Sequence, residues 1–120
     1  MIEVMIAVLL TAIATIGIMG LYTVESRASA FSRRTTEATI LAQDQMERLR
    51  TTPMADATIG GGTAITDLNE YGQVVSGAPY TREWTTIAGS PPTFDDLWVS
   101  VSWDDDGVTK SVALRSRRNL

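Results

Sequence analysis

The stretch VMIAVLLTAIATIGIMGLYTV, residues 4–24, decides the architecture of this 120-residue chain. It holds 21 residues without a charged side chain, close to the ~20 that an α-helix needs to cross the hydrocarbon core of a bilayer. Hydrophobic side chains make up 18 of the first 24 residues but only 44% of the whole chain. The sequence therefore predicts a hydrophobic transmembrane helix over residues 1–24, followed by a small and more polar remainder.

A cleavable secretory signal is the alternative interpretation of residues 1–24. Such a signal needs a positively charged start, an apolar stretch of about 7–15 residues and a small-residue cleavage site. No Lys or Arg precedes Arg27, and the apolar run is longer than a signal needs. A retained membrane anchor is therefore favoured, and flanking positive charge alone would place its Arg27 end in the cytoplasm.

The composition excludes several kinds of functional site. The chain has no Cys and no His, which rules out a disulfide, a thiolate nucleophile, a zinc-finger site and an imidazole general base. Residues 51–120 hold nine acids against five basic residues, which argues against a nucleic acid as partner. Asp95 and Asp96 are adjacent acids, but no nucleophile–base pair or metal-ligand spacing accompanies them. We therefore expect no enzyme activity and no cofactor.

The helical pattern continues beyond the apolar run. Residues 25–52 contain no proline, and their apolar residues recur at spacings of mostly three, four and seven, as on one face of a helix. These residues are Phe31, Ala38, Leu41, Ala42, Met46 and Leu49. Pro53 disfavours helical geometry in the residue before it, so the helix should end near Thr51. Residues 25–52 are thus predicted to be the amphipathic half of one long N-terminal helix.

Residues 53–120 are predicted to form a loop-rich antiparallel sheet. Thr51–Gly62 has the glycine and threonine content of a connector. Strand signals follow at Val74–Val75, at Tyr80–Ile87 and at Leu97–Trp103, where apolar and polar residues alternate. Asp106-Gly107 tolerates positive φ and is a strong hairpin signal. We therefore expect residues 97–115 to form a terminal hairpin.

Neither the helix nor these few strands could hide an apolar face alone. The expected fold is therefore α+β, with the amphipathic half of the helix packed on the sheet. The expected contacts join Phe31, Leu41, Met46 and Leu49 to Val99, Val101 and Trp103, with Val112 and Leu114 alongside.

Three groups of residues are candidates for contacts with other molecules. Small residues at steps of four, Ala7, Thr11 and Thr15, would let another helix approach closely, although the threonines could instead bond their own helix carbonyls. Asp104, Asp105 and Asp106 are weak candidates for Ca²⁺, and a solvated turn is the favoured interpretation. Trp98, opposite the valine face, is the best candidate for a partner surface. Arg115, Arg117 and Arg118 are either a solvated strand end or contacts to an acidic neighbour.

The N-terminal half resembles type IV pilin-like proteins. The resemblance rests on MIEVMIAVLL at residues 1–10, GIMGL at 17–21 and LAQDQMERLR at 41–50. It is similar to the minor pilins of the PilV group and to the related GspI-like minor pseudopilins of type II secretion. VSVSW at 99–103 also matches a C-terminal hairpin common in these proteins. The resemblance implies a pilin-like fold, processing by a prepilin peptidase and a periplasmic sheet domain, the opposite orientation to the one that Arg27 suggests.

Glu3 is the assembly residue that this resemblance implies. Its Ile-Glu-Val context matches the glutamate at the fifth position of mature pilins, which implies that two mature residues precede Met1. In the family this carboxylate neutralises a free N-terminal amine as subunits dock in the membrane. An ammonium among apolar helices is costly unless a carboxylate meets it. The bland alternative is an interfacial residue favoured by the helix dipole.

The function expected from the resemblance is that of a minor pilin. Its implied partners are other minor pilins, the major pilin, a tip adhesin and the inner-membrane assembly platform. Two alternatives stay open: a GspI-like pseudopilin that primes the periplasmic pseudopilus, and a signal-anchored periplasmic binding domain that never polymerises.

Overall fold

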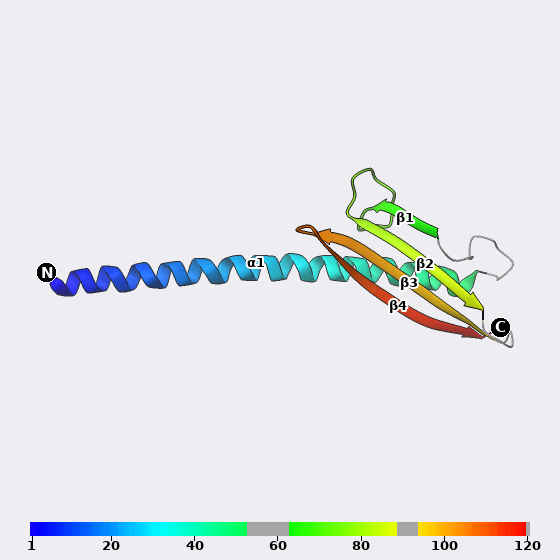
Figure 1. Ribbon diagram of the computed structural model, residues 1–120, viewed down its shortest axis with the longest axis horizontal. Helices are drawn as coiled ribbons and strands as arrows, with labels where there is room; N and C mark the ends of the chain where they lie inside the picture. Colours follow the sequence, from blue (N-terminus) through cyan, green and yellow to red (C-terminus); the bar gives the residue numbers. More distant parts are fainter. Residues whose placement is uncertain (53–62, 89–93, 120) are drawn as a thin grey trace. The chain divides into compact units, whose positions relative to one another are not determined.

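The computed structural model describes residues 1–52, 63–88 and 94–119 of the chain (Figure 1). Within these residues it has the helix α1 (Ile2–Thr51) and the strands β1 (Thr63–Leu68), β2 (Tyr80–Ala88), β3 (Phe94–Asp105) and β4 (Val108–Asn119). The strands form one antiparallel sheet in the order β1-β2-β3-β4. The predicted α+β fold, with a long N-terminal helix packed on an antiparallel sheet, is confirmed. The predicted connector at residues 53–62 lies outside the described residues.

The chain divides into two compact units, Met1–Arg33 and Arg34–Leu120, and α1 contributes to both. In the first unit the large apolar side chains between Ile2 and Val24 are 51–73% exposed. This part of α1 is long and apolar enough to cross a membrane. It could therefore anchor the chain in a membrane, as the sequence predicts.

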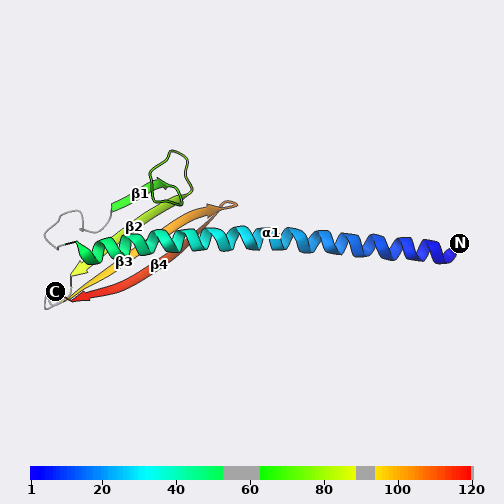
Figure 2. The same cartoon turned by 180° about the vertical axis from the view of Figure 1, so that it is seen from behind.

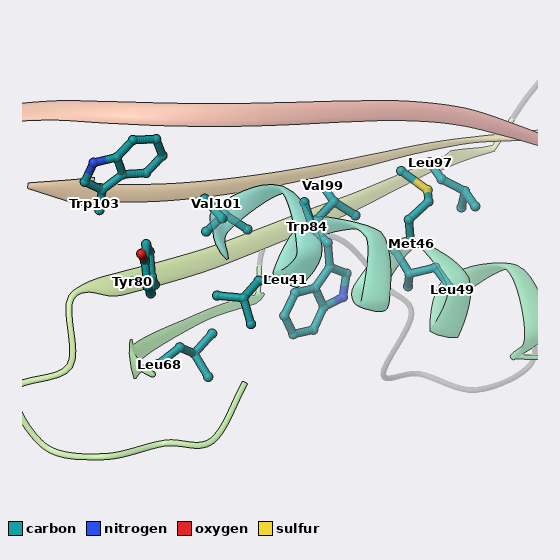
Figure 3. Packing of buried hydrophobic residues seen from close by; sticks show 12 residues of the cluster. Leu41, Met46, Leu49, Leu68, Tyr80, Trp84, Leu97, Val99, Val101 and Trp103 are labelled. Carbon is teal, nitrogen blue, oxygen red and sulfur yellow. The ribbon is translucent and has the colours of Figure 1, made fainter. Parts of the chain in front are cut away.

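The second unit contains the hydrophobic core, and Figure 3 shows its largest side chains. The last part of α1 lies across one face of the sheet (Figures 1 and 2). The buried apolar residues are Ala38, Leu41, Ala42, Met46 and Leu49 from α1, and Leu68, Tyr80, Trp84, Leu97, Val99, Val101 and Trp103 from the sheet. Val112 and Leu114 pack against them from β4. The predicted helix–sheet contacts are confirmed for every residue except Phe31.

Phe31 corrects one expectation, because its side chain is 43% exposed and lies outside the core cluster. It precedes the first buried helix residue, Ala38, by about two helical turns. Aromatic rings from β2 and β3 fill the core instead. Tyr80 and Trp103 pack edge to face with ring centroids 6.3 Å apart.

The terminal hairpin is confirmed and is longer than predicted. β3 and β4 pair in register from Phe94↔Asn119 to Asp105↔Val108. The turn residues Asp106 and Gly107 have φ values of 54° and 79°. A two-residue turn of type I′, whose twist matches that of the two strands, requires positive φ at both central residues.

The first edge of the sheet differs from the prediction. β1 was not expected, and Val74–Val75 is not a strand, because Val74 makes only an isolated bridge to Leu68. The connection is ordered instead by Asn69, whose Oδ1 accepts hydrogen bonds from the backbone nitrogens of Tyr71 (3.0 Å) and Gln73 (2.9 Å). An asparagine side chain that bonds the backbone two residues on mimics a turn.

Candidate functional site

Glu3 lies in the first turn of α1, and its side chain is exposed. A carboxylate there is favoured by the positive end of the helix dipole. The neighbouring Ile2 and Val4 are exposed apolar side chains, 72% and 66% accessible. In lipid or among other helices, a carboxylate in such surroundings needs a cation to offset its burial.

Ala7, Thr11 and Thr15 line one shallow groove on α1 together with Val4, Val8 and Ala12. Thr11 Oγ1 donates to the carbonyl oxygen of Ala7 (2.8 Å), and Thr15 Oγ1 donates to that of Thr11 (2.7 Å). The interpretation that both threonines bond their own helix is therefore confirmed. With the hydroxyls satisfied, the groove is small and apolar, and close approach of a second helix stays a prediction.

The outer face of the sheet, opposite α1, brings three of the predicted partner-surface residues together. Trp98 on β3 pairs with Arg115 on β4, and Asp96 pairs with Arg117 one pleat along. Together with Ile87 of β2 these side chains line a depression of about 760 Å³. We call it the Trp98 depression; the described residues that line it are Thr85, Ile87, Asp96, Leu97, Trp98, Arg115, Ser116 and Arg117.

Arg117 and Asp96 form a fixed ion pair in this depression. Arg117 Nε donates to Asp96 Oδ1 at 2.8 Å and Nη2 donates to Oδ2 at 3.3 Å. The Arg117 guanidinium also stacks on Phe94, 4.2 Å from the ring centroid. The hydrogen bonds from Arg117 hold the pKa of Asp96 below its ordinary value, and those to Asp96 raise the pKa of Arg117.

Arg118 lies on the opposite face of the sheet from Arg115 and Arg117, and its side chain is only 14% exposed. Its Nη2 donates to Asp95 Oδ2 at 3.1 Å. Its Nη1 donates to the carbonyl oxygens of Leu49 (2.9 Å) and Thr52 (2.6 Å) at the end of α1. The expectation of a solvated strand end is therefore wrong for Arg118, because strand alternation directs this residue toward the helix.

Two carboxylates of the acidic turn, those of Asp104 and Asp105, accept hydrogen bonds from other groups of the chain. Asp104 Oδ1 accepts a hydrogen bond from the Gly107 backbone nitrogen (2.9 Å). Asp105 Oδ1 accepts one from Arg34 Nη1 (3.1 Å), which also donates to the Asp104 carbonyl oxygen (3.0 Å). Within residues 1–52, 63–88 and 94–119, no three His, Cys, Asp or Glu side chains gather where they could hold a metal ion. The carboxylates of Asp104 and Asp105 therefore already bond a backbone nitrogen and an arginine of the same chain.

Two charged residues, Asp95 and Arg82, are buried although the sequence does not lead us to expect their burial. Asp95 is fully buried. The Arg82 side chain is 5% exposed, and its Nη1 lies 3.6 Å from Asp44 Oδ2. Burial lowers the pKa of Arg82, although the charge of Asp44 opposes this. The available signal was strand alternation, because Asp95 precedes Leu97, Val99 and Val101 at steps of two, and Arg82 lies between Tyr80 and Trp84.

In comparisons with known proteins, no family model, no curated protein and no solved structure matches this chain. A proposal of function therefore rests on the structure and on the resemblance of the sequence to type IV pilin-like proteins.

Proposed function

We propose that this protein is a minor pilin, a non-catalytic subunit that helps prime assembly of a type IV pilus and lies at or near the pilus tip. The proposal rests on the contrast between the two parts of α1. Its first part is apolar on all sides and begins with a carboxylate, Glu3, whereas its last part is covered by a sheet. A helix of this kind suits a subunit that waits in a bilayer and then joins a bundle of similar helices.

The cost of Glu3 supports assembly over simple anchoring. An anchor needs only apolar side chains, and a carboxylate in the bilayer adds a cost of about 2.5–3.5 kcal/mol at the helix centre and less near its end. That cost is offset when an ammonium group of the same or a neighbouring subunit meets the carboxylate. Glu3 therefore gives docked helices an advantage over isolated ones.

The partners and location follow from the resemblance and belong to this proposal. Before assembly the protein would lie in the bacterial inner membrane with its sheet domain in the periplasm, in contact with the assembly platform. It would then join other minor pilins, the major pilin and a tip adhesin at the cell surface.

Replacing Glu3 tests the proposal directly. In Glu3→Ala the membrane fraction should retain the protein, because the apolar run is unchanged, while its incorporation into filaments should fall severalfold. Glu25→Ala is the matched control, since it removes the same charge from α1 just beyond the apolar run. Quantitative immunoblots of membranes and sheared filaments measure both. Normal piliation and incorporation in Glu3→Ala would contradict the proposal.

The N-terminus of the protein isolated from its native membrane separates the alternatives. Cleavage two residues before Met1, with methylation of the new N-terminal amine, is expected for a pilin or a pseudopilin. Copurifying partners then distinguish the pilus from the type II secretion pseudopilus. An uncleaved N-terminus together with an inert Glu3→Ala would favour an anchored binding domain, for which the Trp98 depression is the observation in favour.

A further inference from the structure

The outer face of the sheet has an apolar floor that no described element covers. Within the Trp98 depression, Ile87 is 60% exposed and the indole of Trp98 is partly exposed. The other two tryptophans, Trp84 and Trp103, belong to the core. An aromatic and an aliphatic side chain held on adjacent rigid strands can receive one large apolar side chain of a partner.

The charge around this floor is positive. Asp96 is the one acid among the described residues of the lining, and its carboxylate is already held by both hydrogen bonds from Arg117. Arg115 lies directly across from Trp98 and makes no ion pair with any described residue, although its charge acts on Asp96. The depression therefore presents a guanidinium beside an indole, and the one acid among its described lining residues is already paired with Arg117.

The position of the depression favours an extended occupant. Arg115, Ser116 and Arg117 line it from β4, which is the last strand in the sheet order and 12 residues long. An extended segment that lies over the outer face along β4 presents every second side chain to the sheet. It can therefore place an apolar side chain and an acidic one in the depression together.

We propose that the Trp98 depression binds an extended acidic segment of a partner protein, with a large apolar side chain against Trp98 and Ile87 and a carboxylate on Arg115. Arginine pairs with carboxylates through two parallel hydrogen bonds, which fixes the orientation of the segment. This inference concerns the sheet domain alone and holds whether or not the protein enters a filament.

A peptide selection tests this inference on the full-length protein in detergent micelles. A phage-displayed library of short random peptides is panned at low ionic strength, because salt screens exposed charges. Enriched peptides should combine Asp or Glu with a large apolar residue. A synthetic copy of the best peptide should also protect Trp98 from acrylamide quenching, which Trp84 and Trp103 already resist through burial.

Four variants locate the site. Trp98→Ala and Arg115→Ala should each weaken binding of the synthetic peptide by about thirtyfold or more, the loss that marks a binding hot spot. Arg115→Glu should select Lys- or Arg-containing peptides instead. Lys110→Glu is the matched control, because it makes the same charge change on β4 outside the depression. It should bind normally and keep the preference for acids.

Three results would overturn the inference. The first is a selection that enriches no peptides, or peptides without acids. The second is binding that is unchanged in Trp98→Ala and Arg115→Glu when circular dichroism shows both variants folded. The third is protection of Trp98 that rises with protein concentration without peptide, because a second copy of this chain would then cover the face. None of these results depends on Glu3, so failure here leaves the assembly proposal intact.

Discussion

Arg118 is the residue that ties the sheet to the end of the helix. Its guanidinium bonds the Asp95 carboxylate and two carbonyl oxygens at the end of α1. The last carbonyls of a helix have no partners within it and carry partial negative charge, so a cation there is stabilising. Asp95 is fully buried, and Arg118 is the cation that compensates it.

We predict that Arg118→Leu lowers the free energy of unfolding by about 3–5 kcal/mol, since it leaves a buried carboxylate without its cation. Removing both partners in Asp95→Leu with Arg118→Leu should recover much of the loss. Urea unfolding followed by circular dichroism measures both effects. Arg117→Leu is the matched control on the exposed face, and a single Arg118→Leu variant as stable as this control would contradict the role of Arg118.

The Asp96–Arg117 pair gives a prediction about pH. The hydrogen bonds from Arg117 lower the pKa of Asp96 below its ordinary 3.8. A carboxyl whose pKa is lower in the folded state than in the unfolded state stabilises the fold above the unfolded value. This contribution is lost as the pH falls through the lowered pKa, so the relevant window lies at and below 3.8.

Arg117→Gln should therefore raise the pKa of Asp96 toward its ordinary value and weaken that acid dependence. A titration of the carboxyl carbons by NMR reads the Asp96 pKa directly. Lys110→Gln removes a β4 charge that makes no contact with Asp96, so the titration of Asp96 should not change. Because the charge of Arg115 also lowers the Asp96 pKa, a smaller lowering should remain. An Asp96 pKa that is unchanged in Arg117→Gln would show that the hydrogen bonds from Arg117 do not cause the lowering.

At the scale of elements, the β3–β4 hairpin depends on its turn. Gly107 has a φ of +79°, and a Cβ added there would meet no atom within 4 Å. A substitution at this residue therefore tests backbone conformation alone. Gly107→Ala should lower the free energy of unfolding by about 1–2 kcal/mol, because a residue with a Cβ is strained at positive φ.

Asp106→Asn is the control for this turn. Asp106 has a φ of 54°, a region that Asn tolerates as well as Asp does. Its stability in thermal unfolding should match that of the parent protein. Equal stability of Gly107→Ala would show that the turn relaxes to another type without cost.

The elements could be predicted where local signals agreed with burial. The helix end, the strand over Tyr80–Ile87 and the terminal hairpin follow from Pro53, from alternation and from Asp106-Gly107, which all act locally. β1 does not follow from the sequence because its six residues show no clean alternation of apolar and polar side chains. A register irregularity between Ile65 and Leu68 blurs that pattern further.

The candidate site was predictable only in part. Strand alternation placed Trp98 opposite the valine face, and it also separates Arg115 and Arg117 from Arg118. Charged side chains are expected at the surface unless they are paired. The burial of Asp95 and Arg82 therefore depends on partner residues in β4 and α1. These partners are distant in the sequence, so no local pattern predicts them. The expectation for Phe31 is wrong for a similar reason, because a stripe of apolar residues on a helix does not show which of them are buried.

At the scale of the whole molecule, every residue of the core cluster belongs to the unit Arg34–Leu120. The Arg34 contacts to the β3–β4 turn also lie within it. The apolar side chains of the first unit take no part in this cluster. The fold of the sheet domain should therefore be independent of residues 1–33.

We accordingly predict that a fragment of residues 34–120 is soluble without detergent and unfolds cooperatively, whereas the full chain needs detergent because its exposed apolar helix aggregates in water. Its thermal midpoint should lie within a few degrees of that of the sheet domain in the full chain. Circular dichroism melts and size-exclusion chromatography measure both properties.

Ala42→Glu in the fragment is the control for a true core, since Ala42 is fully buried and a charge there should abolish the cooperative transition. A fragment that aggregates, or melts without a transition, would mean that the first unit contributes to the core after all.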